Sequence, residues 1–247
     1  MKSLSARIKP SYQFCRDCYV QERKPSGIRM TNYMDSHGTT NYNFKVVLLG
    51  EGCVGKTSVV LRYVEDTFNS DHVTTLQASY VRKRINVGGK SVNLAIWDTA
   101  GQEKFHALGP IYYRMSNGAI LVYDITDEDS FNKVKNWVKE LKKMLGGDIC
   151  LTIAGNKIDL EKDRNVPVDV AEEYSSLVGA KHFQTSAKFN KNIDELFLEL
   201  TQRMIVRYDQ MEAFKQSKGG SMKRNVVVVE DDQGDTADKK QGCCGTS

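Results

Sequence analysis

The pattern of apolar and polar positions divides the chain into a patterned middle part and two polar ends. Between residues 44 and 207, short apolar runs alternate with amphipathic segments, whereas residues 1–43 and 208–247 are polar and lack a periodic pattern. The pattern therefore predicts a disordered N-terminal extension (1–43), one globular domain (44–207) and a flexible C-terminal tail (208–247).

Six short runs in the middle part have the length and composition of strands: 44–50, 79–87, 92–98, 118–124, 149–156 and 181–185. Most are almost continuously apolar, which is typical of strands covered on both faces. Only Gly88 and Gly89 separate the second run from the third, so these two should form an antiparallel hairpin. Helical patterns lie between the other runs, for example at 192–206. This order predicts an α/β fold with a six-stranded, mostly parallel sheet flanked by helices, and ligands at the carboxyl ends of its strands.

Charge and cysteine usage narrow the functional classes. The formal net charge is +4, but residues 1–30 alone carry seven Lys/Arg and two Asp/Glu, so the rest of the chain is close to neutral. Nucleic-acid binding therefore loses its main support. No run approaches the roughly 18 apolar residues of a membrane helix. The six cysteines are scattered and indicate no disulfide framework, so we expect a reducing, cytosolic location.

A phosphate-binding loop follows the first strand. The stretch GEGCVGKT (50–57) has the spacing G-x-x-x-x-G-K-[ST], and the segment KTSVVLRYVED after it has a helical pattern. Backbone N–H groups of residues 52–57 would form an anion site at the positive end of that helix. Lys56 would face the outer phosphates, and the hydroxyl of Thr57 suits Mg²⁺. Cys53 is expected to be a small residue in a cramped loop and not a nucleophile.

Two later motifs indicate which base is bound. Asn156-Lys157-Ile158-Asp159 follows the fifth strand, and Thr185-Ser186-Ala187-Lys188 follows the sixth. The carboxylate of Asp159 could accept hydrogen bonds from the ring N–H and the amine of guanine. Adenine has neither donor on that edge and would leave the carboxylate desolvated and unpaired. The two motifs together with the phosphate loop therefore predict a guanine nucleotide.

A third motif, Asp98-Thr99-Ala100-Gly101-Gln102-Glu103, follows the third strand. The carboxylate of Asp98 could hold Mg²⁺ through water, and Gly101 would let a backbone N–H approach a terminal phosphate. Gln102 could align an attacking water and is the predicted catalytic residue.

With these motifs, the middle of the chain resembles the P-loop NTPases of the Ras-like small GTPase family, and specifically its Rab branch. The stretch LAIWDTAGQEKFHALGPIYYRMSNGAILVYDIT (94–126) reproduces the Rab pattern around the second switch. The resemblance covers about residues 44–207 and the cysteines near the C-terminus. The sequences LGEGCVGKTS and FHALGPIYYR are similar to the corresponding stretches of the early-endosomal Rabs.

The resemblance implies further site residues. Phe68 would stack on the guanine, Ala187 would offer its N–H to the guanine carbonyl, and Thr75, with Thr74 as the competing candidate, would close over Mg²⁺ and the γ-phosphate. The implied phosphate-binding set is Gly50, Gly52, Cys53, Val54, Gly55, Lys56, Thr57, Ser58, Thr75 and Gly101. The guanine set is Phe68, Asn156, Lys157, Asp159, Ser186, Ala187 and Lys188, and the metal set is Thr57, Thr75 and Asp98. One departure is Gln77, where many Rabs have glycine; it touches the effector surface and not the chemistry.

The resemblance also implies a switch cycle: GTP is bound and slowly hydrolysed to GDP and phosphate, and loss of the γ-phosphate releases segments near 70–80 and 99–116. The implied partners are an exchange factor, a GTPase-activating protein, a GDP-dissociation inhibitor, a prenylation escort and GTP-state effectors, with the switch itself a monomer. Effectors would read apolar residues near the switches: Leu76, Trp97, Phe105 and Tyr112. Two rival functions are a binding-only scaffold, which Gln102 argues against, and an ATP-using kinase, which Asp159 argues against.

The two ends carry separate hypotheses. Cys243 and Cys244, followed by Gly-Thr-Ser, resemble a double geranylgeranyl site more than a C-a-a-X box, since two lipids give stable anchoring. Together with the resemblance to the early-endosomal Rabs, such an anchor implies a protein on the cytoplasmic face of endomembranes, at early endosomes, with a carrier-bound cytosolic pool. Val226–Val229 would be a handle for the prenylation escort or have no role. At the other end, Cys15 and Cys18 offer two ligands where structural zinc wants four, and residues 1–16 resemble a transit peptide only faintly. An upstream start is the alternative, because Met30 and Met34 precede the domain.

Overall fold

The computed structural model describes residues 13–14, 33–34, 40–70, 75, 78–101 and 109–218. Contacts between Cα atoms divide the chain into two units, residues 1–210 and 211–247. The packing and the site described below lie within the first unit. The domain boundaries at 43/44 and 207/208 stay predictions.

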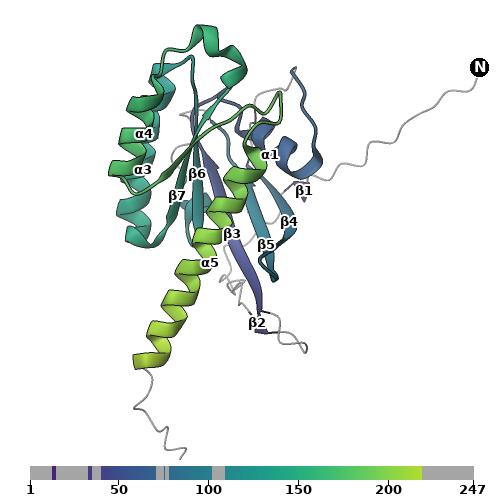
Figure 1. Ribbon diagram of the computed structural model, residues 1–247, viewed down its shortest axis with the longest axis vertical. Helices are drawn as coiled ribbons and strands as arrows, with labels where there is room; N and C mark the ends of the chain where they lie inside the picture. Colours follow the sequence, from purple (N-terminus) through teal and green to yellow (C-terminus); the bar gives the residue numbers. More distant parts are fainter. Residues whose placement is uncertain are drawn as a thin grey trace, which may run out of the picture. The chain divides into compact units, whose positions relative to one another are not determined.

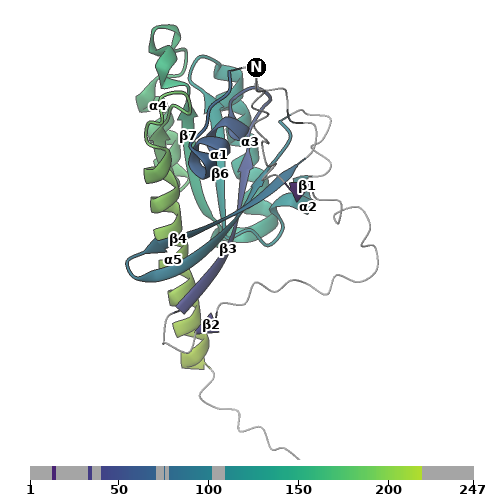
Figure 2. The same cartoon turned by 90° about the vertical axis from the view of Figure 1, so that its right-hand side faces the viewer.

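The six predicted strands are present and form one sheet. They are β3 (Thr40–Leu49), β4 (Ser79–Val87), β5 (Lys90–Asp98), β6 (Gly118–Asp124), β7 (Cys150–Asn156) and β8 (Lys181–Gln184). Their order is β4-β5-β3-β6-β7-β8, and every pair is parallel except β4–β5. In Figure 1, β5 lies between β3 and β4, and Figure 2 shows this part of the sheet turned by 90°. Two further strands of two residues each join it: β1 (Gln13–Phe14) pairs with β4, and β2 (Tyr33–Met34) pairs with β3.

The hairpin between β4 and β5 forms as predicted. Gly88 and Gly89 have φ angles of 57° and 80°, the left-handed values that a tight two-residue hairpin turn requires at both central positions. The register pairs Val87 with Lys90 across this turn and Ser79 with Asp98 at the other end. The hairpin therefore fixes where β5 ends, and with it the position of Asp98.

Five α-helices and two 3₁₀ helices occur in the described residues: α1 (Lys56–Glu65), α2 (Gly109–Tyr113), α3 (Glu128–Leu145), α4 (Val168–Leu177), α5 (Ile193–Lys218), η3 (Gly146–Asp148) and η4 (Ile158–Asp163). Figure 1 shows α1 and α5 on one face of the sheet and α3 and α4 on the other. Asp127 caps α3 by accepting from the backbone N–H groups of Asp129 and Ser130. This arrangement covers both faces of the parallel strands, as their apolar composition requires.

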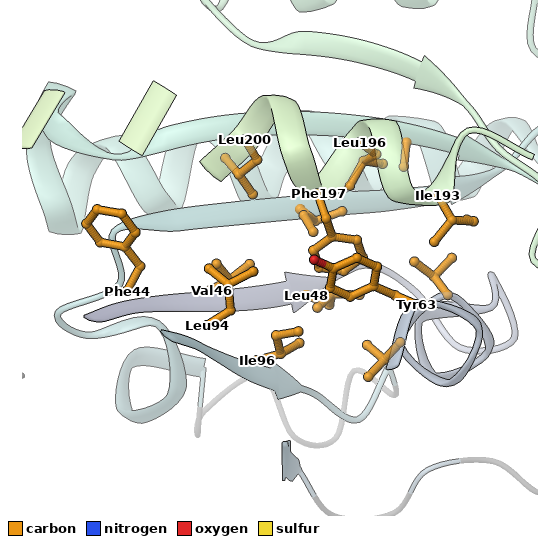
Figure 3. Packing of buried hydrophobic residues seen from close by; sticks show 14 of the residues in the cluster. Phe44, Val46, Leu48, Tyr63, Leu94, Ile96, Ile193, Leu196, Phe197 and Leu200 are labelled. Atoms are coloured by element: carbon orange, nitrogen blue, oxygen red, sulfur yellow. The ribbon is translucent and has the colours of Figure 1, made fainter. Parts of the chain in front are cut away.

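The core consists of two layers that the alternation along each strand separates. In β3, Val46 and Leu48 point toward α1 and α5, whereas Val47 and Leu49 pack with the residues of α3. Figure 3 shows the first layer, where the rings of Tyr63 in α1 and Phe197 in α5 stack with their centroids 3.7 Å apart. These contacts hold α1, and therefore the phosphate loop before it, against the end of β3.

β3 and α5 are both longer than the sequence pattern predicts, and each supports the other. β3 begins at Thr40 and not at residue 44, and α5 ends at Lys218 and not at residue 206. The hydroxyl of Tyr42 donates to Asp209 Oδ1 (2.9 Å), and the rings of Tyr42 and Tyr208 meet edge to face. The polar sequence at 40–43 does not predict a strand, because the residues that pack on Tyr42, Tyr208 and Asp209, lie far along the chain.

Candidate functional site

The predicted site residues meet at the carboxyl ends of β3, β5, β7 and β8, around a cavity of about 310 Å³. Sixteen residues line it: Gly52, Cys53, Gly55, Lys56, Thr57, Ser58, Phe68, Asn69, Ser70, Thr75, Gly101, Asn156, Lys157, Asp159, Ala187 and Lys188. Fourteen of them belong to the set that the sequence predicts; Asn69 and Ser70 do not. No motif signals these two, and their nearness to Phe68 is the one hint in the sequence.

Four predicted residues do not line the cavity but support those that do. They are Gly50, Val54, Asp98 and Ser186. Val54 is buried and accepts a hydrogen bond at its carbonyl from Asn156 Nδ2 (2.9 Å). Gln102 lies outside the described residues, as do Thr74, Leu76, Gln77, Phe105 and the cysteines at positions 15, 18, 243 and 244.

The side chain of Lys56 spans the phosphate loop, and this residue is only 5% exposed. Its ammonium group donates to the carbonyl groups of Gly50 (2.9 Å) and Glu51 (2.8 Å), so it lies across the loop. Burial lowers the pKa of Lys56 to about 8, although the nearby carboxylates of Asp98 and Glu51 partly oppose the decrease. A buried cation with few counter-charges favours an anionic ligand, which a phosphate chain supplies.

The loop leaves no room for larger side chains at two glycines. A Cβ atom at Gly55 would lie 2.5 Å from Asn156 Nδ2, and Gly55 has a φ of 94°. A Cβ atom at Gly101 would lie 2.4 Å from the carbonyl oxygen of Glu51 and 2.5 Å from Lys56 Nζ. Glycine at these two positions therefore lets the chain pack closely against Asn156, Glu51 and Lys56. Cys53 also has a positive φ (61°), is exposed and is not in a disulfide bond.

Three oxygen ligands meet at the metal end of the cavity. Thr57 Oγ1 lies 2.7 Å from Thr75 Oγ1 and 2.6 Å from Asp98 Oδ2. Two hydroxyl groups and a carboxylate are hard oxygen donors of the kind that Mg²⁺ prefers. Asp98 is 1% exposed, which places its charge away from bulk water. The donor set therefore fits Mg²⁺, with Thr57, Thr75 and Asp98 as the residues that would hold it.

The base end of the cavity is organised around Asp159 and Asn156. Asp159 Oδ1 accepts from the hydroxyl of Ser186 (2.5 Å), which orients the carboxylate. Asn156 Oδ1 accepts from Thr185 Oγ1 and from the backbone N–H of Ala187, both at 3.3 Å. Lys157 lies 2.6 Å from Asp124 Oδ2, and this ion pair fixes its side chain at the wall. The N–H of Ala187 therefore already donates to Asn156 Oδ1, the same N–H that is predicted to bond to the guanine carbonyl.

The remaining predicted residues lie at the rim of the cavity or beyond it. Phe68 lines the cavity and is 37% exposed, and its stacking on the base stays a prediction. Trp97 and Tyr112 are half-buried and pack against the layer that contains α3. Their rings are 6.3 Å apart, and Tyr80 is 5.1 Å from Trp97. Trp97 therefore contributes to the core and to a surface cluster with Tyr80 and Tyr112.

Comparison with known protein families and with characterised proteins agrees with this geometry. The family model described as "Ras family" matches residues 45–206. The chain therefore belongs to the Ras family of small GTPases, which bind GTP and GDP with Mg²⁺ and hydrolyse GTP.

The similar proteins are Rab GTPases. The chain is 64% identical to Ras-related protein Rab-21 of Mus musculus over 208 residues, which are 83% of this chain and 93% of that protein. The Homo sapiens Rab-21 is also 64% identical, with 83% and 92% covered. Rab-21 of Dictyostelium discoideum is 56% identical over 209 residues, with 83% and 98% covered. The predicted resemblance to the Rab branch is confirmed, and with it GTP hydrolysis and the general regulation of Rab proteins by exchange factors, activating proteins and GDP-dissociation inhibitors.

Within the part of the chain that the structure describes, no helix is long and apolar enough to cross a membrane. The same residues contain no cluster of three His, Cys, Asp or Glu side chains that could hold a metal ion, so the metal set above depends on its threonine hydroxyls.

Proposed function

We propose that this chain is a lipid-anchored switch of the Rab type that controls vesicle traffic at early endosomes. Its similarity to the Rab-21 proteins supports the Rab assignment. The observation that carries the switch is the contact between Thr75 and Thr57. A residue of the first switch lies 2.7 Å from a hydroxyl of the phosphate loop, so nucleotide and switch share one site.

In this proposal the described residues bind and orient the nucleotide. The phosphate loop and Lys56 hold the phosphates, Asp159 pairs with the donor edge of guanine, and Phe68 stacks on the ring. Bound Mg²⁺ would neutralise charge on the outer phosphates, with Thr57, Thr75 and Asp98 holding it. Gln102 would orient the attacking water. An activating partner would supply the additional positive charge that speeds hydrolysis.

Partner recognition and membrane attachment complete the proposal. Trp97, Tyr112 and Tyr80 form an aromatic cluster beside the switch segments, and we assign effector binding to this surface together with Leu76 and Phe105. Cys243 and Cys244 are the proposed geranylgeranyl sites, reached by a prenylation escort and shielded by the GDP-dissociation inhibitor. The chain would then cycle between early endosomal membranes and a cytosolic, carrier-bound pool.

The experiment that tests this function follows the tagged full chain in cells. Wild type, Gln102→Leu and Thr57→Asn are compared for localisation, and the purified proteins for GTP turnover. Gln102→Leu should bind GTP, hydrolyse it much more slowly and accumulate on early endosomal membranes. Thr57→Asn should favour the inactive state and shift to the cytosol. Equal distributions for the three proteins would contradict a switch.

Lipid attachment needs a separate test. Mass spectrometry of the chain from eukaryotic cells should show two lipid additions, at Cys243 and Cys244. The double variant Cys243→Ser/Cys244→Ser should be cytosolic; if it still fractionates with membranes, the anchor lies elsewhere.

A further inference from the structure

Arg62 connects the helix after the phosphate loop to the loop that contacts the base. It lies in the last turn of α1, and its side chain is 14% exposed. Its Nε donates to the carbonyl oxygen of Ala187 (2.9 Å), and its Nη2 donates to that of Lys188 (3.3 Å). Both acceptors belong to residues that line the cavity, yet Arg62 itself does not line it.

The other side of the same guanidinium group holds the end of α1. Nη1 of Arg62 donates to the backbone carbonyl of Asp66 (2.8 Å) and to Asp66 Oδ1 (2.9 Å). In return, the N–H of Asp66 donates to the carbonyl of Arg62 (3.1 Å), which ends the helix. Asp66 is two residues before Phe68, so this end of α1 sets where the chain leaves toward the stacking ring.

Asn190 closes the network. Its Nδ2 donates to Asp66 Oδ1 (3.2 Å), so the carboxylate of Asp66 joins α1 to the segment after Lys188. Asp66 and Asn190 both have positive φ angles, 53° and 51°, which puts each at a sharp change of chain direction. One arginine thus connects two segments that would flank the guanine, at 186–188 and at Phe68.

We propose that Arg62 is a positioning residue for guanine recognition, and this inference rests on the guanine site of the proposed function. By fixing the carbonyl groups of Ala187 and Lys188, it keeps the neighbouring Ser186 where its hydroxyl orients Asp159 (2.5 Å). The planar guanidinium group reaches four oxygen acceptors at once, in two directions. A lysine has one ammonium nitrogen and cannot reach all four.

The role makes a specific kinetic prediction. Loss of Arg62 should loosen the base end of the site and leave the phosphate end intact. In Arg62→Ala, GDP should dissociate about ten- to a hundredfold faster, the range expected when hydrogen bonds from a charged group are removed. IDP lacks the amine that Asp159 would bind, so its release should accelerate less. The ratio of IDP to GDP release rates, above one in wild type, should therefore fall toward one.

The experiment measures release of fluorescent GDP and IDP from the full chain, with and without EDTA, for wild type, Arg62→Ala and Arg62→Lys. Arg203→Ala is the matched control, because Arg203 also donates to a backbone carbonyl, that of Leu151 (2.8 Å), but at the amino end of β7. EDTA acts at the phosphate end and should accelerate release by the same factor in every variant. Arg62→Lys should recover part of the IDP-to-GDP ratio, and Arg203→Ala should retain all of it.

Three results would separate the possibilities. If wild type releases GDP and IDP at the same rate, the proposed guanine site itself is wrong. If wild type discriminates and Arg62→Ala discriminates equally well, the guanine site stands and the role of Arg62 is wrong. Loss of discrimination in Arg203→Ala would also overturn that role, because it would make the effect one of general stability. If Arg62→Ala does not fold, Asn190→Ala can be used instead, because it removes only the hydrogen bond to Asp66 Oδ1. This variant should lower the ratio of IDP to GDP release rates to a smaller extent.

Discussion

Asn156 Nδ2 donates to the carbonyl oxygen of Val54 over 2.9 Å, so a single side chain joins the end of β7 to the phosphate loop after β3. The other end of the same amide accepts from Thr185 and from the N–H of Ala187. Asn156 is 2% exposed, so these polar groups have no water to replace a lost partner. The phosphate end and the base end of the cavity are thereby held as one unit.

Asn156→Ala should therefore weaken both ends of the site. Leaving the Val54 carbonyl without its donor should lower the free energy of unfolding by about 1–3 kcal/mol and accelerate GDP release by tenfold or more. Denaturant titration and fluorescent GDP dissociation measure the two effects. Asn165→Ala is the control, since its amide also donates to a carbonyl, that of Thr126 (2.7 Å), but at an exposed position. Equal GDP release in the two variants would contradict the coupling.

Thr57→Ala should make nucleotide release insensitive to Mg²⁺. In wild type, the hydroxyl of Thr57 contacts both Thr75 Oγ1 and Asp98 Oδ2. Its removal takes away one of the three oxygen donors that would hold Mg²⁺. In wild type, EDTA should accelerate GDP release strongly; in the variant the two rates should nearly coincide. Thr201→Ala in α5, whose hydroxyl donates to the carbonyl of Phe197, serves as the control. A variant that keeps the full EDTA response would show that the metal is held elsewhere.

His182 should make stability depend on pH below neutrality. Its side chain is 4% exposed, and Nε2 lies 3.0 Å from the hydroxyl of Tyr123. Burial and, to a smaller extent, the positive charge of Arg164 lower the pKa of His182 to about 4. His182 therefore binds a proton more tightly in the unfolded chain than in the folded one. Its contribution to the free energy of unfolding is fully present above about pH 6.5. It falls as the pH drops toward 4, by at most roughly 1.4 kcal/mol per pH unit.

The variant His182→Gln tests this by removing the titration while keeping a group that can bond to Tyr123. Urea unfolding of the GDP-bound proteins at pH 7.5, 6.5 and 5.5 should show that wild type loses more stability than the variant between the last two values. Parallel losses would mean that His182 titrates normally in the folded protein.

The sequence predicted the site because its parts are local motifs at the ends of strands. The spacing of Gly50, Gly55 and Lys56 between a strand and a helix predicts the loop, and the apolar strands place Asp98 and Asn156 at one edge of the sheet. The elements themselves follow from periodicity, which is why the six strands and the β4–β5 hairpin agree with expectation.

Long-range pairings could not be predicted in this way. Arg62 has the ordinary sequence context of a helix surface, and two of its partners, Ala187 and Lys188, lie 125 and 126 residues further along the chain. The extension of β3 to Thr40 depends on Tyr42 meeting Tyr208 and Asp209, which no local pattern signals. Asn69 and Ser70 line the cavity without belonging to any of the motifs in the sequence.

Guanine recognition by Asp159 underlies the proposed switch, and a change in base specificity measures it. Competition between fluorescent GDP and unlabelled GDP, ADP and XDP should show that wild type binds GDP far more tightly than the other two. Asp159→Asn replaces an acceptor by a side chain that can donate to the carbonyl group of xanthine, so it should weaken GDP binding and strengthen XDP binding. If wild type binds ADP with the same affinity as GDP, or if Asp159→Asn keeps the wild-type preference for GDP over XDP, Asp159 does not select the base.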